Sequence, residues 1–215
     1  MPRVSPEHLE RRRQQILDAA RTCFIREGVH ATSMQDIFAE AGLSAGAVYR
    51  YFKSKTEIIE AITGMVIGDL HVFLGELARH DPVLPLDELV VRVAQRVVLL
   101  SGPDGTMRLA PQAWALAMYD PELRRYVQQN VVGLRAHWTE YARRCVQAGM
   151  LPPGTDPQAA GKAIFGIVPG FLLQRLIMED ISPEELRAGV RAMARESLLM
   201  PGATTGSSTE AVSGS

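Results

Sequence analysis

Apolar side chains recur with helical rather than alternating spacing along almost the whole chain, and this pattern most constrains how the chain can fold. The segment 6–27 shows the pattern, because five of its apolar residues share one helical face: Ile16, Leu17, Ala20, Cys23 and Phe24. Alternation typical of strands is absent, and the Val-rich stretch 90–100 is too long and too helically spaced to be a strand. The sequence therefore predicts an all-α protein.

Glycine and proline mark where the helices begin and end. Gly28 and Gly42 follow two predicted helices, and proline follows Asp or Ser at the predicted helix starts 121, 157 and 183, among others. Ser54 and Glu57 have the spacing of a capping box at the start of a long helix. About nine helices are predicted, over residues 6–27, 34–41, 45–52, 54–79, 86–100, 106–118, 121–148, 157–178 and 183–199.

Composition favours a globular protein in a reducing compartment. Hydrophobic residues make up 47% of the 215 residues and charged residues 22%, which allows a packed core. No run approaches the roughly 20 apolar residues of a membrane span, and residues 1–10 lack a signal-type apolar stretch, so a cytoplasmic protein without a membrane partner is expected. Cys23 and Cys145 are expected to be buried, reduced thiols, with redox sensing as the alternative.

The net charge of −1 conceals an asymmetry between the two ends of the chain. Residues 1–55 hold nine Lys and Arg residues against six acidic residues, whereas the remaining 160 residues hold 14 basic and 18 acidic residues. A basic head on an acidic body indicates that one end meets a polyanion. The alternative interpretation is a solvated charged face.

Residues 33–52 have the pattern of a helix-turn-helix unit. Gly42 stands where the first helix must end in a left-handed conformation, and Ser44 stands at the N-cap of the second. The inward face that holds the two helices together is predicted to consist of Ile37, Ala41, Leu43, Val48 and Phe52. The second helix of such a unit enters the major groove of DNA.

The composition of that second helix suits contact with DNA. Ala45, Gly46 and Ala47 lower its helix propensity, by about 1 kcal/mol for the glycine, but let the backbone approach a partner closely. The hydrogen-bond donors Tyr49, Arg50 and Tyr51 follow, and such side chains reach phosphates and base edges. The alternative is a helical hairpin with exposed aromatic residues.

Several groups that bind anions are predicted to converge beside this unit. Lys55 lies in the first turn of the next helix, where the macrodipole disfavours a cation by roughly 0.3–1 kcal/mol unless an anion is also bound. Lys53 lies two residues earlier, and Thr32 and Ser33 place hydroxyl groups at the start of the first helix of the unit. Solvated lysines remain the alternative for Lys53 and Lys55.

The resemblance to a known family is carried by the stretches GVHATSMQDI (residues 28–37) and AGLSAGAVYRYFKSK (residues 41–55). Over about residues 10–60 the chain resembles the DNA-binding head of the tetracycline-repressor (TetR) family. The resemblance implies phosphate contacts by Thr32, Ser33, Tyr49, Tyr51 and Lys55, with Lys53 nearby, and contacts to bases or adjoining backbone by Ser44, Ala45, Gly46, Ala47 and Arg50. Because the side chains of residues 45–47 are so small, part of the specificity is expected to come from DNA shape.

The expected organisation follows from this resemblance. Residues 1–53 are predicted to form a three-helix helix-turn-helix DNA-binding domain, residues 54–200 a helical effector-binding and dimerisation domain, and residues 201–215 a disordered tail. The expected function is that of a sequence-specific regulator, a repressor that binds a pseudo-palindromic operator as a homodimer; an activator remains the alternative. Arg11–Arg13 could form an arm in the minor groove or a solvated helix start.

The last two predicted helices are the expected dimer interface. The segment 165–174 is apolar almost all round, as a helix buried on two sides must be, although Pro169 is expected to kink it. A four-helix bundle across a two-fold axis is predicted to involve Phe165, Gly166, Gly170, Phe171, Gln174, Leu186, Val190 and Met193.

A pocket for a small, hydrophobic or aromatic effector is predicted between the long helix 54–79 and the middle helices. Its predicted lining is Met65, Phe73, Leu99, Met107, Trp114, Met118, Trp138 and Tyr141, with Arg108, Gln112 and His137 as polar anchors. The alternative is that these residues belong to the core. Effector binding is expected to move the first turns of helix 54–79 and so to change the spacing of the two heads.

Other functions have less support in the sequence. An enzyme is not expected, because the chain lacks a glycine-rich phosphate loop and a nucleophile elbow. The five histidines, at positions 8, 30, 71, 80 and 137, are scattered, so no metal and no cofactor are expected. A helical interaction module that does not bind DNA is the second alternative, which the charge asymmetry disfavours.

Overall fold

Every regular element in residues 5–199, the part of the chain that the computed structural model describes, is helical, which confirms the predicted fold class. The elements are α1 (Pro6–Glu27), α2 (Met34–Ala41), α3 (Ala45–Tyr49), α4 (Lys55–Ala78), α5 (Leu86–Leu100), the 3₁₀ turn η1 (Thr106–Leu109), α6 (Ala110–Ala117), α7 (Pro121–Gln147), α8 (Pro157–Leu173), the π turn η2 (Gln174–Met178) and α9 (Pro183–Leu199). The disordered tail predicted for residues 201–215 lies outside the described residues.

Most of the predicted helix limits are confirmed to within one residue, and three differ. Helix α3 ends at Tyr49 rather than at residue 52, because a turn follows in which the N–H groups of Tyr51 and Phe52 both bond to the carbonyl of Val48. The predicted helix 106–118 begins as η1, since Pro111 has no N–H and stands in the first turn of α6. The predicted helix 157–178 ends in the π turn η2.

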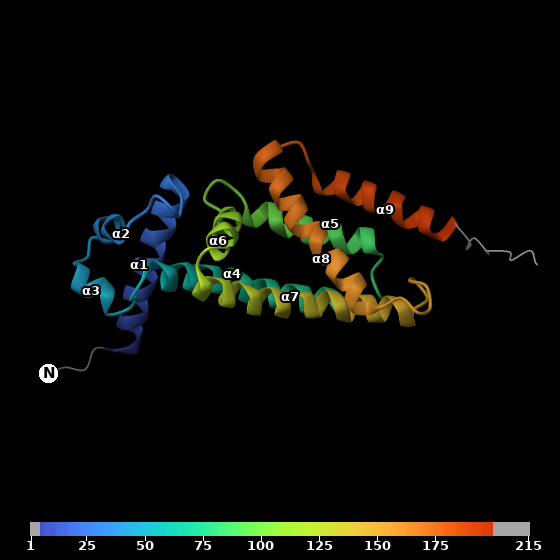
Figure 1. Cartoon of the computed structure of the whole chain (residues 1–215), viewed down its shortest axis with the longest axis horizontal. Coiled ribbons are helices and arrows are strands. Elements are labelled where there is room, and N and C mark those ends of the chain that lie inside the picture. The colour runs from blue at the N-terminus through green and yellow to red at the C-terminus, as the bar shows by residue number, and fades with distance from the viewer. Residues whose placement is uncertain (1–4, 200–215) are drawn as a thin grey trace, which may run out of the picture.

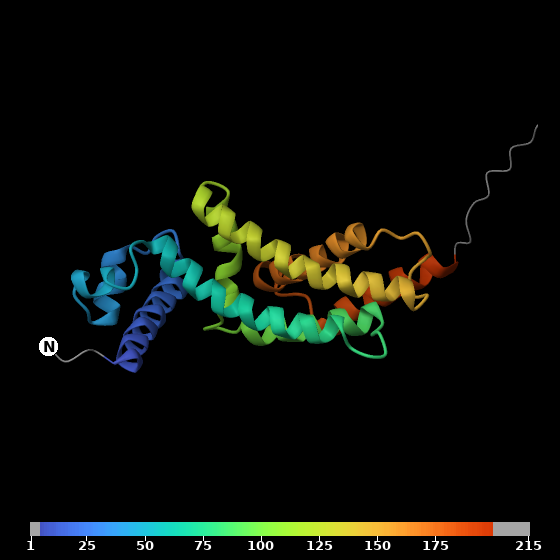
Figure 2. The same cartoon turned by 90° about the horizontal axis from the view of Figure 1, so that it is seen from below.

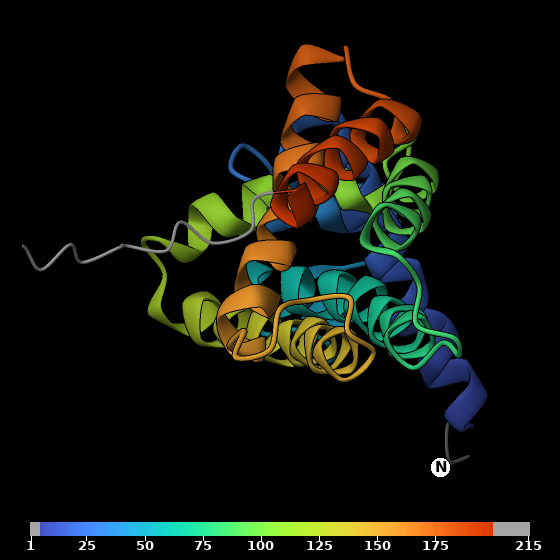
Figure 3. The same ribbon diagram turned by 90° about the vertical axis from the view of Figure 1, so that its right-hand side faces the viewer.

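The head and the body lie end to end. Helices α1–α3 form the head, and α4 leads away from it into the body (Figure 1). In the body, α4 and α7 lie side by side along the long axis (Figure 2). Helix α8 then crosses from the end of α7 toward α5 and α9, which pack against each other on the other side of the body (Figure 3).

One hydrophobic cluster joins the head to the body. It contains head residues such as Ile16 and Phe24 together with Leu109, Ala113 and Leu123 from η1, α6 and α7. The head is therefore packed directly on α6, rather than being tethered by α4 alone. The domain limits at residues 53 and 54 stay a prediction.

Ion pairs fix the orientation of α9 against α5. Arg187 contacts Asp87 at 3.2 Å and Glu88 at 2.7 Å, and Arg191 contacts Asp87 at 2.7 Å. The Asp87 side chain is only 12% exposed, so these pairs lie partly inside the contact between the two helices. The orientation turns Val190 of α9 into the core of its own chain.

Two helices are long and apolar enough to cross a membrane, judged by length and composition alone. The sequence had predicted no such segment. These two helices are α4 and the combined stretch Pro157–Met178. Neither stretch is an uninterrupted apolar run, because each contains a few polar residues. Apolar residues of both helices line the interior cavity described below.

Candidate nucleic-acid interface and interior cavity

Local capping interactions position the α2–α3 unit. Ser33 and Asp36 form a reciprocal capping box at the start of α2, and the Ser44 side chain accepts a hydrogen bond from the Ala47 N–H at the start of α3. Gly42 ends α2 with φ 63° and ψ 32°, the left-handed conformation that glycine adopts without strain. Ile37 and Val48 are fully buried between the helices and α1, so the unit has one defined geometry.

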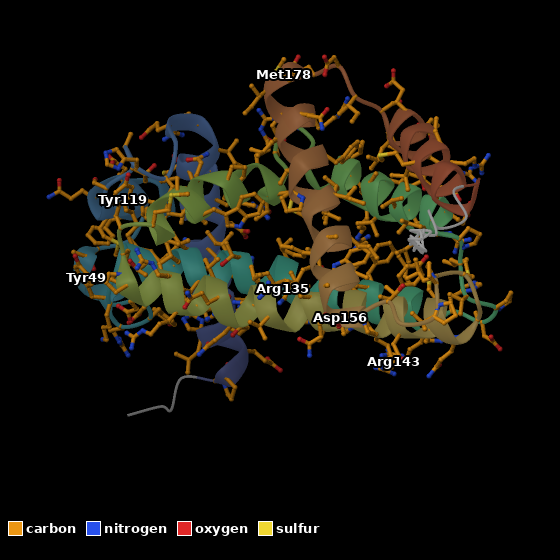
Figure 4. All side chains as sticks on the ribbon, turned by 45° about the vertical axis from the view of Figure 1, so that its right-hand side comes forward. Tyr49, Tyr119, Arg135, Arg143, Asp156 and Met178 are labelled. Carbon is orange, nitrogen blue, oxygen red and sulfur yellow. The ribbon has the colours of Figure 1, made fainter. Side chains whose placement is uncertain are left out.

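The outer surface of α3 is small at its start and aromatic and cationic at its end. Ser44, Ala45 and Gly46 are exposed, and nothing lies within 4 Å of the place where a side chain on Gly46 would begin. Tyr49 is 42% exposed, and its ring packs edge-on against Phe38 with centroids 5.4 Å apart. Figure 4 shows Tyr49 at the outer end of the head. This surface offers a close backbone approach with hydrogen-bond donors beside it.

The other residues predicted for α3 and its flank are less uniformly exposed. Arg50 and Lys53 are exposed, whereas Ala47 and Tyr51 are half-buried beside a shallow hollow next to Arg12. The Lys53 ammonium donates to the Tyr49 carbonyl at 2.6 Å and so caps the end of α3. Of the predicted contacts, the exposed residues are therefore Ser33, Ser44–Gly46, Tyr49, Arg50 and Lys53.

Thr32 and Lys55 have structural partners that the sequence interpretation did not foresee. Thr32 is 1% exposed and its hydroxyl donates to the Gly28 carbonyl at 2.9 Å, so this side chain is not available to a phosphate. The Lys55 ammonium donates to the carbonyls of Val29, His30 and Thr32 at 2.9, 3.4 and 2.8 Å, and burial lowers the pKa of Lys55. The anion expected beside Lys55 is replaced by carbonyl oxygens of the turn 28–33.

The predicted capping box at Ser54 is only half formed, and the arginine arm is helical. Ser54 accepts from the Glu57 N–H, but the Glu57 carboxylate accepts from the Lys53 N–H rather than from Ser54. Arg11–Arg13 belong to α1, which begins at Pro6, and Arg13 lies over the Phe52 ring at 5.5 Å. This geometry corresponds to the helix-start interpretation of the three arginines.

The body contains a cavity of about 340 Å³, partly open to the surface, with walls from α4, α5, η1, α6, α7 and α8. Its walls are almost entirely apolar. The lining residues are Thr63, Val66, Ile67, Leu70, Val97, Thr106, Met107, Ala110, Ala113, Trp114, Leu123, Tyr126, Val127, Asn130, Val131, Leu134, Phe165, Val168, Pro169 and Leu172.

Three polar side chains in the cavity wall, those of Tyr126, Asn130 and Thr63, have partners on the backbone. The Tyr126 hydroxyl donates to the Glu60 carbonyl at 2.8 Å, the Asn130 amide donates to the Tyr126 carbonyl at 2.8 Å, and the Thr63 hydroxyl donates to the Ile59 carbonyl at 2.7 Å. None of the residues that line the cavity is Asp, Glu, Lys, Arg or His. A ligand of this cavity is therefore expected to be neutral and largely apolar.

Only Met107 and Trp114 of the predicted pocket residues line this cavity. Trp138 and Tyr141 are 2% exposed in a separate core cluster, where the Tyr141 hydroxyl donates to the Leu84 carbonyl. The remaining predicted residues lie elsewhere, because a helix has several faces and composition does not show which face meets the cavity. Met65, Leu99 and Met118 are more than half exposed, and Phe73 and Leu99 line an open groove between α4 and α5. Arg108 and Gln112 line a hollow between α6 and α8, and His137 pairs with His71.

The sequence interpretation missed most of the cavity wall, including its polar groups. The missed residues of α7 recur at helical spacing, from Leu123 through Tyr126, Val127, Asn130 and Val131 to Leu134. Their spacing indicates that these residues share one face of α7. The signal does not distinguish a face that borders a cavity from one that packs against a helix.

The residues predicted for the dimer interface divide into inward and outward groups. Phe171 and Val190 are 1% and 3% exposed in the core of their own chain, Leu186 packs on the same core, and Phe165 lines the cavity. Their place in the core corrects the prediction that they face a second copy. The exposed residues of the predicted interface are Gly166, Gln174 and Met193, and the neighbouring apolar residues Leu173, Ile177 and Met178 are exposed as well. A Cβ added at Gly170 would meet nothing within 4 Å. Figure 4 shows Met178 at the tip of η2, which continues α8.

The two cysteines have the environment expected of buried thiols. Both are free and buried, and burial raises the pKa of each. A raised pKa keeps the thiol protonated and unreactive at neutral pH. Among the described residues, no group of three or more His, Cys, Asp or Glu side chains is suited to hold a metal ion.

Comparison with known proteins assigns both parts of the chain. Residues 16–62 match the family model of bacterial regulatory proteins of the tetR family, and residues 90–199 match the model of the BetI-type transcriptional repressor C-terminal region. The HTH-type transcriptional regulator TtgR of Pseudomonas putida is 27% identical over 187 residues, which cover 84% of this chain and 87% of that protein.

Solved structures share the fold. A complex of SmeT with triclosan, in which SmeT is the repressor of a multidrug efflux pump of Stenotrophomonas maltophilia, has a TM-score of 0.66 at 24% identity and covers 94% of this chain and 99% of that one. A regulator from Saccharomonospora viridis in complex with choline has a TM-score of 0.68 at 19% identity, covering 86% and 96%. At these identities the likeness concerns the fold alone.

Proposed function

The chain belongs to the TetR family of bacterial transcriptional regulators, and from this premise we propose that it is a repressor that binds a pseudo-palindromic operator as a homodimer and leaves it when a small apolar molecule binds. Its curated relatives are regulators rather than enzymes. We further propose that it acts in the cytoplasm. Helices α4 and α8 owe their apolar character to the cavity and to the contact between protomers rather than to a membrane.

The observation that carries the proposal is the exposed surface of α3. Val48 packs α3 into the core, but its first residues, Ala45 and Gly46, are exposed and contribute little to packing, so this start is better explained by a partner that approaches the backbone. Tyr49, Arg50 and Lys53 lie beside it and can donate to phosphates, or in the case of Arg50 to a base. The excess of basic residues in residues 1–55 attracts the same polyanion.

A single head makes few phosphate contacts, so tight and specific binding requires two heads one helical turn apart. The proposed contact between protomers is the outward face of α8 and η2, with Gly166 and Gly170 from α8 and Gln174 and Ile177 from η2. Glycine at two successive turns lets a second helix approach closely. Shape readout is proposed to supply part of the specificity, because the side chains of residues 45–47 are too small to read many base edges.

The proposed effector is a neutral aromatic or aliphatic molecule. The cavity wall lacks a charged group and includes the aromatic side chains of Trp114, Tyr126 and Phe165. A structural neighbour of this chain binds triclosan, which makes triclosan a suitable first probe. Choline, bound by another neighbour, is less suitable, since no lining carboxylate would balance its charge.

The experiment that tests the proposal is selection of the purified protein from a pool of random double-stranded DNA at moderate salt. We expect enrichment of an inverted repeat and an affinity that falls steeply with salt. Gly46→Glu is the matched variant, because the open space around Gly46 accommodates the new side chain while its charge repels phosphate. Gly68→Glu, at an equally open position on α4, serves as the control. The proposal is contradicted if the wild-type protein enriches no sequence, or if Gly46→Glu enriches the same sequences as strongly as the wild type.

A further inference from the structure

Val29 lies in the turn 28–33, and both of its backbone polar groups are held by side chains from the body. Its N–H donates to Oε1 of Gln112 at 2.7 Å, and its carbonyl accepts from Nζ of Lys55 at 2.9 Å. Gln112 belongs to α6 and Lys55 is the first residue of α4. Val29 itself is 1% exposed, so water does not reach this residue freely. The turn that leads into α2 and α3 is thus fixed from two sides.

The same two helices are walls of the cavity. Ala110, Ala113 and Trp114 line it from α6, and Gln112 faces a separate hollow beside Ile25 of α1. At 100° per residue, Gln112 stands on roughly the opposite side of α6 from the three lining residues. Because α6 has only eight residues, a ligand that displaces its cavity side also displaces Gln112.

The Gln112 bond is more sensitive to such a displacement than the Lys55 contacts. It is a single short bond, and a shift of about 1 Å takes it beyond hydrogen-bond range. The buried N–H group of Val29 would then lack a hydrogen-bond acceptor, which costs free energy. A movement of the turn that gives this group another partner removes that cost. The Lys55 ammonium has three carbonyl partners on a flexible stem and can follow a moving turn.

We propose that Gln112 is a positioning residue that couples the cavity to the head: its bond to Val29 holds the turn 28–33, and with it α2 and α3, in the DNA-binding position, and an occupied cavity breaks that bond. This inference rests on the proposed function and names the side chain that carries its regulation. It also gives a role to a polar residue of α6 whose neighbours in the hollow, apart from Arg108, are apolar.

Two substitutions separate the hydrogen bond from the packing of the side chain. Gln112→Met keeps the length of the side chain and removes the acceptor, whereas Gln112→Glu keeps an acceptor oxygen and lies beside Arg108, which lines the same hollow and offers an opposite charge. Without ligand, we expect Gln112→Met to bind the selected operator at least tenfold more weakly than the wild type. Gln112→Glu should stay within about threefold of wild type.

Three further measurements distinguish coupling from a structural role. In Gln112→Met, triclosan affinity, followed by tryptophan fluorescence, should stay within about twofold of wild type and the melting temperature should change little. Its remaining operator affinity should respond only weakly to triclosan. Hydrogen exchange at the Val29 amide should rise in Gln112→Met, and should rise in the wild-type protein when triclosan is added.

The inference is overturned if Gln112→Met binds the operator and responds to triclosan like the wild type. It is also overturned if operator affinity, ligand affinity and melting temperature all fall together, because Gln112 then only stabilises the fold. A wild-type protein that selects no operator, or that fails to bind triclosan, is a failure of the proposed function instead. In that case hydrogen exchange at the Val29 amide still tests the role of Gln112. An unchanged exchange rate in Gln112→Met overturns that role, whereas a raised rate supports the Gln112–Val29 bond as the restraint on the turn.

Discussion

Nδ1 of His71 on α4 lies 3.0 Å from Nε2 of His137 on α7, with the two rings packed edge to face. The pair joins two helices that both line the cavity. One imidazole must donate and the other accept, so at least one of the two is neutral while the bond exists. Burial lowers the pKa of His137, and the charges of His71 and Arg79 act in the same direction.

We therefore expect the free energy of unfolding to fall as the pH decreases below about 6.5, the ordinary histidine value. Near that pH the unfolded chain binds more protons than the folded protein, so stability rises with pH through this range. His137→Gln should flatten the dependence of the melting temperature on pH between about 5 and 8. His30→Gln, at an exposed histidine of the head, is the control, and an unchanged slope in His137→Gln contradicts the prediction.

Lys55→Met should reduce stability without changing the electrostatics of DNA binding. The loss of the contacts to three carbonyls is expected to cost about 1–3 kcal/mol in the free energy of unfolding. The slope of log affinity against log salt should stay the same, since the loss of a phosphate contact would reduce it by about 0.9. Lys53→Met, at an exposed position of the head, should show that reduction. A reduced slope with unchanged stability in Lys55→Met would restore the phosphate assignment.

Tyr49→Phe should weaken DNA binding about tenfold, as expected for the loss of one hydrogen bond to a charged phosphate. The weakening should be similar for every selected sequence, because a phosphate contact carries no base preference. Tyr119→Phe provides the control on the α6–α7 turn, where Tyr119 is 87% exposed (Figure 4). Relaxed preference at a single base position would instead assign Tyr49 to base readout.

Val131→Phe should block the cavity. Val131 lines it, and the larger side chain is expected to lower triclosan affinity at least tenfold by occupying space that the ligand needs. Val132→Phe introduces the same change one residue further on, where the side chain is 58% exposed and does not line the cavity. Fluorescence titration of both variants gives the comparison, and equal affinities would place the ligand elsewhere.

Gly170→Arg should weaken the dimer while leaving the protomer folded. Nothing within 4 Å opposes a Cβ at this position, so the protomer accommodates the side chain, but a second α8 packed against it could not. We expect the dimer dissociation constant to rise at least tenfold in analytical ultracentrifugation, with a parallel loss of operator affinity. Gly68→Arg tests the same change at an open glycine of α4. A stable Gly170→Arg dimer would move the interface away from this face.

The sequence predicted the parts of this protein that depend on neighbours in the chain. The end of α2 at Gly42, the cap at Ser44 and the proline starts of α7, α8 and α9 are all confirmed. Each is decided within about four residues, because helix ends are satisfied by the nearest side chains and by the local backbone conformation. The head motif consists of such local signals, which is why the amino-acid sequence alone was enough to identify it.

Only the tertiary structure decided where individual side chains of the body lie. Gln112, predicted as a ligand anchor, bonds to Val29, which is 83 residues away in the chain. Lys55 reaches carbonyls more than 20 residues away, and Phe171 packs in its own core rather than against a second copy. Helical spacing determines which residues share a face, but the partner of that face depends on how the helices cross, and no local pattern encodes that crossing.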